Sequence, residues 1–530
     1  MRTLLKNGLI VDGSGKAAFT GSVVVDRDRI VEVMENAPES FNGYVMDCEG
    51  LVVAAGFIDG HSHHDWFMDR NDPLPYFDRY AEQGITGSIA GNCGFSGPGH
   101  PRNFVKRPTS GYKEDGLDFS RMDDWFNYMD KISPANMACL QGHGTIRAGL
   151  VGNDPAPLSP ENMKEMLRIA EESLEAGACG ISLGLMYAPG IFAPMDELME
   201  MARLCKKYDK VLTVHPRAQG IVSTAYPIVE GERPHILKAL DEVVEMGRQT
   251  GAKVHYSHAM FLGHKTFACN DELMETMMRA HREGVDISFD LYALDCGTSF
   301  ITFIMPDWYH ALSAEDKKKP ENLKKFKDEF EAMEDVNGYG YHSICIGGAG
   351  GYVEMEAYTG KRLVDIAKQW GMSNFDTYIK LVDLSHSQAR VIMDGFYNDE
   401  IIEIQARHPL SQFMTDSWYE PESKQNEHLY SGFTRFLELC REGHGPALEE
   451  TVHKMSGKIA KRFSLRDRGI LQKGAFADIV VFDLNAVKTY PGKRSDGIQH
   501  VFINGRHVLK EGTLDRTLFA GAGSSMRVFT

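Results

Sequence analysis

The residues that decide the fold are Leu51-Val-Val-Ala-Ala-Gly-Phe-Ile-Asp-Gly-His-Ser-His63, an apolar run that ends in two histidines. We predict that residues 51–58 form a strand. Residues i and i+2 of a strand point to the same side, so His61 and His63 should converge at its carboxyl end, while His64 points away. Imidazole is a good ligand for zinc and similar ions. The stretch suggests a metal site, although an isolated pair of this kind is about as often structural.

Downstream of this stretch, short apolar runs alternate with longer helix-like segments. Strands are expected at 138–141, 180–183, 211–215, 253–257 and 286–289, and helices at 160–176, 196–208, 234–250 and 270–283. Such alternation implies a parallel sheet. Over about 400 residues a closed barrel is the commonest solution. We therefore predict an α/β fold of the (β/α)₈, or TIM-barrel, type.

The two chain ends look different from the middle. Short apolar runs separated by turn residues fill the first 55 residues, and the run Ala477–Asp483 has the same texture near the other end. We expect residues 1–55 and 468–530 to pair into one small β module and residues 56–467 to form the barrel. Residues 300–350 fit the alternation poorly and include a charged helical run at 314–335. They are interpreted as an insertion that acts as a lid.

Composition excludes several classes of function. The chain has 530 residues and a net charge of −17, which argues against nucleic acid as a partner but not against a small anionic substrate. The nine cysteines are scattered and form no CxxC motif, as is typical of a reduced, cytoplasmic protein. The amino-terminal residues lack the pattern of a signal peptide. No apolar run reaches the roughly 18 residues that a membrane-spanning helix needs.

Three more metal-ligand candidates follow predicted strands. His215 ends the run 211–214, His258 follows 253–257, and Cys93 follows the apolar stretch 85–90. Each residue alone would be interpreted as structural, but several at successive strand ends are hard to explain by packing. Asp416 also follows an apolar run, and a carboxylate beside a metal ion can serve as general base and then general acid. Without the other residues it would be taken for a loop or N-cap aspartate.

A set of longer motifs gives the pattern a family resemblance. In chain order they are GFIDGHSHHD (56–65), GNCG (91–94), GHGTIR (142–147), SLGLMYAPG (182–190), VHPR (214–217), SH (257–258), TDS (415–417) and KGAFADIVVFD (473–483). With these motifs the sequence resembles the amidohydrolase superfamily, and within it the N-acyl-D-amino-acid deacylase, or D-aminoacylase, branch. The motifs extend over nearly the whole chain.

The resemblance implies a (β/α)₈ barrel with a small β-sandwich formed by both chain ends. It also implies one zinc held tightly by Cys93, His215 and His258. A second, weaker metal position would use His61 and His63, with Cys93 bridging the two. Asp416 would be the catalytic acid and base, and Tyr187 would lie near the substrate. His143 and Arg147 match a motif of the branch for which we assign no role.

Two departures from the branch concern the substrate. After Ser257-His258 the branch has x-Lys, whose lysine meets the substrate carboxylate, and here Met260 takes its place. Lys265 is out of register. Farther on, an arginine of the branch that also holds the carboxylate aligns with His428, although Arg435 could still serve. Histidine cannot copy the bidentate grip of arginine, so we place Met260 and His428 at an altered substrate site.

The sequence therefore predicts a zinc-dependent hydrolase of a non-peptide C–N (amide) bond. Its partner would be a small-molecule amide other than a simple N-acyl-D-amino acid, with no nucleic acid and no membrane involved. One alternative is hydrolysis of a cyclic amide or lactam, or deamination, on the same metal site. Another is a non-catalytic binding relative, which the retention of all the ligand residues disfavours. A homo-oligomer is compatible with the sequence.

Overall fold

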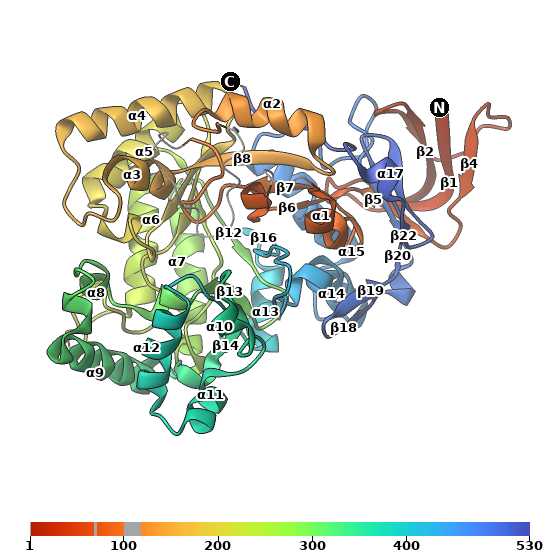
Figure 1. Ribbon diagram of the computed structural model, residues 1–530. Coiled ribbons are helices and arrows are strands. Elements are labelled where there is room, and N and C mark those ends of the chain that lie inside the picture. Colours follow the sequence, from red (N-terminus) through yellow and green to blue (C-terminus); the bar gives the residue numbers. More distant parts are fainter. Residues whose placement is uncertain (1, 68–71, 100–117, 230, 530) are drawn as a thin grey trace.

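A parallel barrel forms the centre of the computed structural model, which describes residues 2–67, 72–99, 118–229 and 231–529 (Figure 1). Eight strands follow one another around it in sequence order: β6 (Phe57–Asp59), β7 (Ile85–Ala90), β8 (Asn136–Gly142), β9 (Gly180–Gly184), β10 (Val211–His215), β11 (Lys253–Tyr256), β12 (Ile287–Leu291) and β16 (Ser411–Phe413). The two outermost strands meet beyond their ends, where the Asp416 amide donates to the His61 carbonyl at 3.0 Å. The predicted (β/α)₈ fold is confirmed.

Amphipathic helices cover the outside of the barrel. They are α1 (Leu74–Ala81), α2 (Met122–Ile132), α3 (His143–Val151), α4 (Pro160–Glu175), α5 (Met195–Lys207), α6 (His235–Thr250), α7 (Asn270–Arg282), α13 (Asp399–Arg407), α14 (His428–Glu442), α15 (Leu448–Met455) and α16 (Gly457–Arg462). The predicted helices lie within one residue of the observed ends. Local signals explain this agreement: Ser159 caps α4 by accepting from the Asn162 amide at 3.2 Å, and Gly251 ends α6 in the left-handed region.

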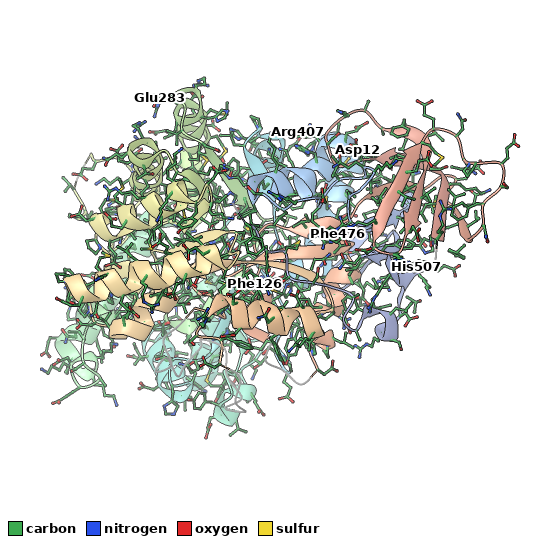
Figure 2. All side chains as sticks on the ribbon, turned by 90° about the horizontal axis from the view of Figure 1, so that it is seen from above. Asp12, Phe126, Glu283, Arg407, Phe476 and His507 are labelled. Carbon is green, nitrogen blue, oxygen red and sulfur yellow. The ribbon has the colours of Figure 1, made fainter. Side chains whose placement is uncertain are left out.

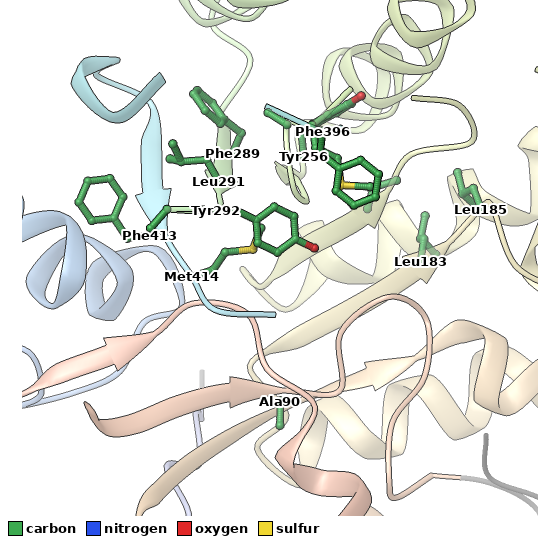
Figure 3. Packing of buried hydrophobic residues seen from close by; sticks show 14 of the residues in the cluster. Ala90, Leu183, Leu185, Tyr256, Phe289, Leu291, Tyr292, Phe396, Phe413 and Met414 are labelled. Carbon is green, nitrogen blue, oxygen red and sulfur yellow. The ribbon is translucent and has the colours of Figure 1, made fainter. Parts of the chain in front are cut away.

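Apolar side chains from the barrel strands form the main core. Figure 3 labels several of them, including Leu183 on β9, Phe289 and Leu291 on β12, and Phe413 at the end of β16. Phe413 stacks on Phe436 of α14 with the ring centroids 3.6 Å apart, which ties the last barrel strand to its helix. The strand ends that carry the polar candidates are thus held by a close-packed frame.

The predicted strand 51–58 is wrong in one respect, because it is two strands that belong to different sheets. β5 (Val52–Ala55) pairs within the chain-end sheet, and β6 begins the barrel. The break falls at Gly56, where an added Cβ would lie 2.4 Å from the Thr86 Oγ1 atom. Close packing at this position excludes a side chain. His61 and His63 consequently lie beyond the end of β6 rather than on a strand.

The chain ends form one nine-stranded sheet beside the barrel. It contains β1 (Arg2–Val11), β2 (Phe19–Asp26), β3 (Arg29–Met34), β4 (Tyr44–Asp47), β5, β17 (Ile479–Phe482), β20 (Ile498–Ile503), β21 (Arg506–Lys510) and β22 (Thr513–Leu514). The antiparallel pair β5–β17 joins the two ends, with Val53 opposite Val481. The sheet has a buried apolar cluster of its own. In the view from above, His507 on this sheet lies to the right of Phe126 on α2 of the barrel (Figure 2).

Parts of the segment 468–530 lie outside that sheet. The hairpin of β18 (Lys488–Tyr490) and β19 (Lys493–Asp496) approaches α14, where the Thr489 hydroxyl donates to Glu438 at 2.6 Å. After the short helix α17 (Arg516–Phe519), the last residues run along β8, and the Met526 amide donates to the Met137 carbonyl at 2.8 Å. The carboxyl end accordingly lies near α2, over the barrel (Figure 1).

A long insertion separates β12 from β16. Its antiparallel sheet contains β13 (Gly297–Phe300), β14 (Ile344–Gly348) and β15 (Arg390–Met393), and its helices are α8 (Asp307–His310), α9 (Pro320–Asn337), α10 (Val353–Glu356), α11 (Leu363–Trp370) and α12 (Asn374–Leu384). The predicted range 300–350 was therefore too short. The charged run 314–335 also begins its helix late, because Pro320 occupies the first turn, and Gly338 ends that helix in the left-handed region. Among the described residues, no helix is long and apolar enough to cross a membrane.

Candidate metal centre

The six residues predicted to carry the chemistry meet at the carboxyl ends of the barrel strands, where barrel enzymes place their active sites. They come from five places: the loops after β6, β7 and β16, the end of β10, and the turn after β11. All six side chains are buried. Their ligand atoms fall into two groups whose members lie within 4.8 Å of one another. The groups are Cys93, His215 and His258, and His61, His63, Cys93 and Asp416.

Cys93 lies at the centre and belongs to both groups. Its Sγ atom is 3.2 Å from His61 Nε2. It is 3.6 Å from His215 Nδ1 and 3.5 Å from His258 Nε2, and these two nitrogens are 2.8 Å apart. Burial raises the pKa of the Cys93 thiol, but the surrounding imidazoles lower it more, so the pKa lies well below its usual value. A thiolate among imidazole nitrogens is a donor set that suits zinc.

A second layer of groups orients the histidines. The Asp290 carboxylate lies 3.2 Å from His61 Nδ1 and 3.0 Å from His255 Nε2, and it accepts the His258 amide. The Gln219 amide lies 3.0 Å from His258 Nδ1, and its Oε1 atom has no hydrogen-bond partner among the described residues. Rotation of that amide lets Oε1 accept from Nδ1–H, which leaves His258 Nε2 available to an ion. Buried partners of this kind fix imidazole orientation in metal sites.

The backbone is strained at three of the six residues. Cys93, His258 and Asp416 have φ angles of +53°, +37° and +43°, which residues other than glycine rarely adopt. Each such residue costs about 1–3 kcal/mol and persists only where the surrounding structure enforces its conformation. Because the strained residues are ones that carry candidate donor atoms, their side chains are held in place at a cost in stability.

Asp416 sits between the His61 and His63 rings on one side and the hydroxyl of Tyr292 on the other. Its Oδ1 atom lies 3.1 Å from His63 Nε2 and 3.4 Å from His61 Nε2, while its Oδ2 atom accepts a hydrogen bond from the Tyr292 hydroxyl. Burial raises the pKa of Asp416, but His61 and His63 lower it, and the net pKa is below the usual value. The carboxylate is thus ionised and positioned to accept a proton.

The three predicted substrate residues lie at different depths. A small inner pocket beside the ligand group includes Tyr187 and Met260 in its lining. The Tyr187 ring lies 4.5 Å from that of His215, centroid to centroid. His428 lies behind Tyr292, with the ring centroids 4.9 Å apart, and both its nitrogens are engaged: Nε2 accepts from the Leu294 amide at 3.2 Å and Nδ1 is 2.9 Å from Asn426 Oδ1. His428 therefore supports Tyr292 and does not line the inner pocket.

The structure also shows where His143 and Arg147 lie, the two motif residues that had no assigned role. His143 and Arg147 both contact Glu197, at 2.7 and 3.1 Å, and so fasten α3 to α5. The sequence reasoning missed Asp290 and Tyr292. They follow a predicted strand at alternate positions, the same i, i+2 rule that identified His61 and His63, and could have been found with it. His64 packs on Phe77 and Tyr80, away from the cluster as expected.

An eight-stranded parallel barrel with clustered histidine, cysteine and carboxylate side chains at its carboxyl edge is the architecture of a metal-dependent hydrolase. The chain belongs to the amidohydrolase family, whose sequence pattern matches residues 44–291 and 415–509. The unmatched stretch between these segments contains the insertion. The chain is thus a metal-dependent hydrolase that acts on the carbon–nitrogen bond of amides.

Individual relatives place the chain in the D-aminoacylase branch, as the motifs predicted. It is 28% identical to the D-aminoacylase of Alcaligenes xylosoxydans xylosoxydans over 519 residues, which cover 96% of this chain and 94% of that enzyme. The N-acyl-D-glutamate deacylase of Bordetella bronchiseptica, solved with zinc and a phosphonate inhibitor, is 25% identical, with a TM-score of 0.80 and 99% of both chains covered. A D-aminoacylase structure described by its binuclear metal centre is also 25% identical, with a TM-score of 0.78 and the same coverage.

Proposed function

We propose that the chain is a zinc-dependent deacylase of neutral small-molecule amides rather than of simple N-acyl-D-amino acids. One observation carries the chemical part of this proposal. The buried Cys93 sulfur lies within 3.6 Å of nitrogens from three histidines that come from different strand ends. Packing alone does not gather a thiol and three imidazoles in a buried place, because their desolvated polar atoms need a partner. Zinc is the ion that such N and S donors favour.

The two groups of ligand atoms support one tight and one weaker metal position. Cys93, His215 and His258 would hold the first ion through one sulfur and two nitrogens. His61 and His63 would hold the second together with Cys93, and Asp416 lies against the same two histidines. The His63 Nδ1 atom has no hydrogen-bond partner among the described residues, so its orientation is less firmly held than that of His61. That difference supports the weaker assignment.

Asp416 and Tyr292 are suited to general acid–base catalysis of amide hydrolysis. An ion bound here would polarise the amide carbonyl and make the attacking water more acidic. Asp416 would remove a proton from that water while the oxygen–carbon bond forms. The same carboxyl group would then deliver the proton to the nitrogen as the carbon–nitrogen bond breaks. The Tyr292 hydroxyl holds Oδ2 and thereby keeps Oδ1 turned toward the reacting atoms.

The charge of the inner pocket supports the neutral substrate. No lysine or arginine occurs among the described residues that line it. Met260 occupies the place of the expected lysine and is buried. The two cations that the sequence left open are engaged elsewhere: Lys265 donates to the Asp335 carbonyl at 2.5 Å, and Arg435 donates to Glu438 at 2.8 Å. A free carboxylate in the inner pocket would therefore be buried with no lysine or arginine side chain to pair with, at considerable cost.

Elemental analysis of three purified proteins tests the metal part. We expect one or more zinc ions per chain in the wild type, loss of zinc in Cys93→Ala, and retention in Cys440→Ala, a cysteine on α14 outside the cluster. Absence of zinc from the wild type after zinc has been supplied would contradict the proposal. A panel of linear amides, lactams and cyclic amidines, scored separately for acid, amine and ammonia, tests the reaction. Release of ammonia alone would replace deacylation by deamination.

A further inference from the structure

The inner pocket beside the metal ligands is too small for a substrate. Its volume is about 20 Å³, while a single ordered water needs at least roughly 10–15 Å³. Asp416, Tyr292, His215 and His258 reach this pocket, so the reacting carbonyl must approach it. Only one or two water-sized groups fit there. The substituents of the amide must therefore lie elsewhere.

A second cavity adjoins the inner pocket and is large enough. Its volume is about 870 Å³, within the range of sites that enclose whole organic molecules. The two cavities share Met186, Tyr187 and Phe303 in their linings. Since the Tyr187 ring also contacts the His215 ring, the residues that the two cavities share adjoin the ligand cluster.

The large cavity lies along the seam between the barrel and the insertion. From the barrel come Phe95 after β7, Ala148 on α3, and residues 186–189 after β9. The insertion contributes six residues between Phe300 and His310 inclusive, Leu323 on α9, and Ile379 and Val382 on α12. Figure 1 shows the insertion beside the strand ends of the barrel, coloured green to cyan. The aromatic and aliphatic side chains predominate in this lining.

Charged side chains occur toward the outside of the large cavity. Lys318 and Asp383 are exposed, and Lys317 is half-buried, with its ammonium 5.9 Å from the centroid of the Tyr309 ring. Lys317 and Lys318 belong to a single short turn, residues 316–318, at the edge of the insertion. An occupant would therefore meet apolar walls near the metal ligands and polar groups near solvent.

From this arrangement we infer that the substrate is an amide with a long or bulky apolar substituent, which lies in the large cavity while the carbonyl reaches Asp416. This inference rests on the proposed function and specifies its substrate class. Buried apolar surface would supply the binding energy that a missing carboxylate clamp cannot. The shared chemistry is the apolar group, which can belong to the acyl half or to the amine half of the amide.

Two homologous series of substrates test the inference and separate the two halves. One series lengthens the acyl chain of an N-acyl glycinamide from acetyl to decanoyl. The other lengthens the alkyl chain of an N-alkyl acetamide from methyl to decyl. In the half that enters the cavity, we expect kcat/KM to rise about threefold to fourfold per methylene over the first several carbons. Equal kcat/KM along both series would overturn the inference.

Neighbouring residues on α12 provide a matched pair of variants. Ile379 lines the cavity, whereas Lys380 is exposed and does not. Ile379→Trp should abolish the dependence on chain length, so that the long compounds react no faster than the acetyl or methyl compound. Lys380→Trp should behave as the wild type. Ala148→Phe fills the same cavity from the barrel side, and should reproduce the effect of Ile379→Trp if that variant folds poorly.

Calorimetric binding of two uncharged probes, 1-decanol and 2-dodecanone, to the zinc-loaded protein separates failure of this inference from failure of the proposed function. If no amide is hydrolysed, the deacylase proposal fails. Binding of either compound to the wild type and to Lys380→Trp, lost in Ile379→Trp, would still support the apolar cavity. If short amides are hydrolysed and neither compound binds, the cavity assignment is overturned while the deacylase proposal stands.

Discussion

The Nδ1 atom of His61 lies 3.2 Å from the Oδ2 atom of Asp290, and this contact directs the opposite ring nitrogen toward Cys93. The same carboxylate contacts His255 Nε2 and accepts the His258 amide, so it fixes both a side chain and a backbone segment of the candidate metal centre. Burial raises the pKa of Asp290, but His255 and His61 lower it by more. The net pKa is below the usual value, so the carboxyl group remains ionised. An ionised carboxylate behind an imidazole makes that imidazole a stronger ligand.

Replacing this carboxylate should weaken metal binding. We expect Asp290→Asn to reduce zinc affinity by about 10- to 100-fold, the usual cost of losing a partner behind a metal ligand. Competition titration with a zinc chelator measures the change directly. Asp124→Asn, on the exposed side of α2, is the control and should keep the wild-type affinity. Equal affinities for the two variants would mean that Asp290 serves the fold alone.

The acid–base assignment predicts a different outcome for Asp416. Asp416→Asn should lower kcat by about 10²- to 10⁴-fold, because the asparagine side chain cannot take a proton from water. Zinc on Cys93, His215 and His258 should stay bound, since these three donors form a group without Asp416. Activity and zinc content measured on the same preparation check both statements. Substantial turnover by Asp416→Asn would show that another group moves the proton.

Tyr292 provides a graded comparison at the same carboxylate. Tyr292→Phe removes the hydroxyl that donates to Asp416 Oδ2 but retains the ring that packs against His428. Because the base is still present, we expect about a tenfold loss of kcat, the value of one hydrogen bond of about 1.4 kcal/mol. A loss as large as that of Asp416→Asn would instead assign Tyr292 a direct contact with the reacting atoms.

The sequence predicted the barrel and the meeting of the six candidate residues, because both depend on local signals. Strand runs, helix caps and residues that follow strand ends are visible one segment at a time, and six such residues met as expected. The long apolar run 51–58 was misjudged because its division at Gly56 depends on Thr86, a residue from another strand. Periodicity within a segment cannot reveal a contact between segments.

The insertion and the support of the site were less accessible from sequence for the same reason. The insertion sheet pairs β13 with β15 across about ninety residues, so its true extent appears only in three dimensions. His428 was assigned to the substrate by alignment, yet its ring nitrogens are occupied by Leu294 and Asn426. Leu294 lies in the turn after β12, and Asn426 lies in the loop before α14. No motif links either residue to His428.

The occupied nitrogens of His428 predict a pH effect on stability. Burial lowers the pKa of His428 to about 3, whereas an unfolded histidine titrates near 6.5. Between these values the unfolded chain binds one more proton than the folded chain. Stability should therefore fall as the pH drops from 6.5 toward 3, by about 1.4 kcal/mol per pH unit for one such group.

His428→Gln removes this titration while keeping a donor and an acceptor. The variant should be less stable than the wild type at pH 7.5, because its contacts with Asn426 and Leu294 are imperfect. The difference in stability between the two proteins should narrow at pH 4.5, because only the wild type has to keep His428 neutral at that pH. Thermal unfolding at both pH values, with zinc held at one concentration, gives the comparison. Parallel loss of stability in the two proteins would contradict the lowered pKa.

Met260 offers a test by gain of function. Its side chain lines the inner pocket at the place where the D-aminoacylase branch has a lysine. Met260→Lys would supply the cation that a substrate carboxylate lacks here, and a charge-assisted hydrogen bond is worth about 1.5–3 kcal/mol. We therefore expect kcat/KM for N-acetyl-D-leucine to rise about 10- to 100-fold relative to that for N-isopentylacetamide, which differs only in lacking the carboxylate.

Leu262→Lys is the matched control for this substitution. Leu262 lines the same pocket two residues farther along the chain, so Leu262→Lys brings the same charge to the same pocket from a half-buried position. Its amide donates to the Gln219 carbonyl at 2.8 Å, which fixes it on the side of the pocket that faces Gln219. If selectivity for the carboxylate appears in Met260→Lys and not in Leu262→Lys, position 260 decides the substrate charge. Equal gains would show that any cation suffices, and no gain in either would place the substrate's polar end outside the inner pocket.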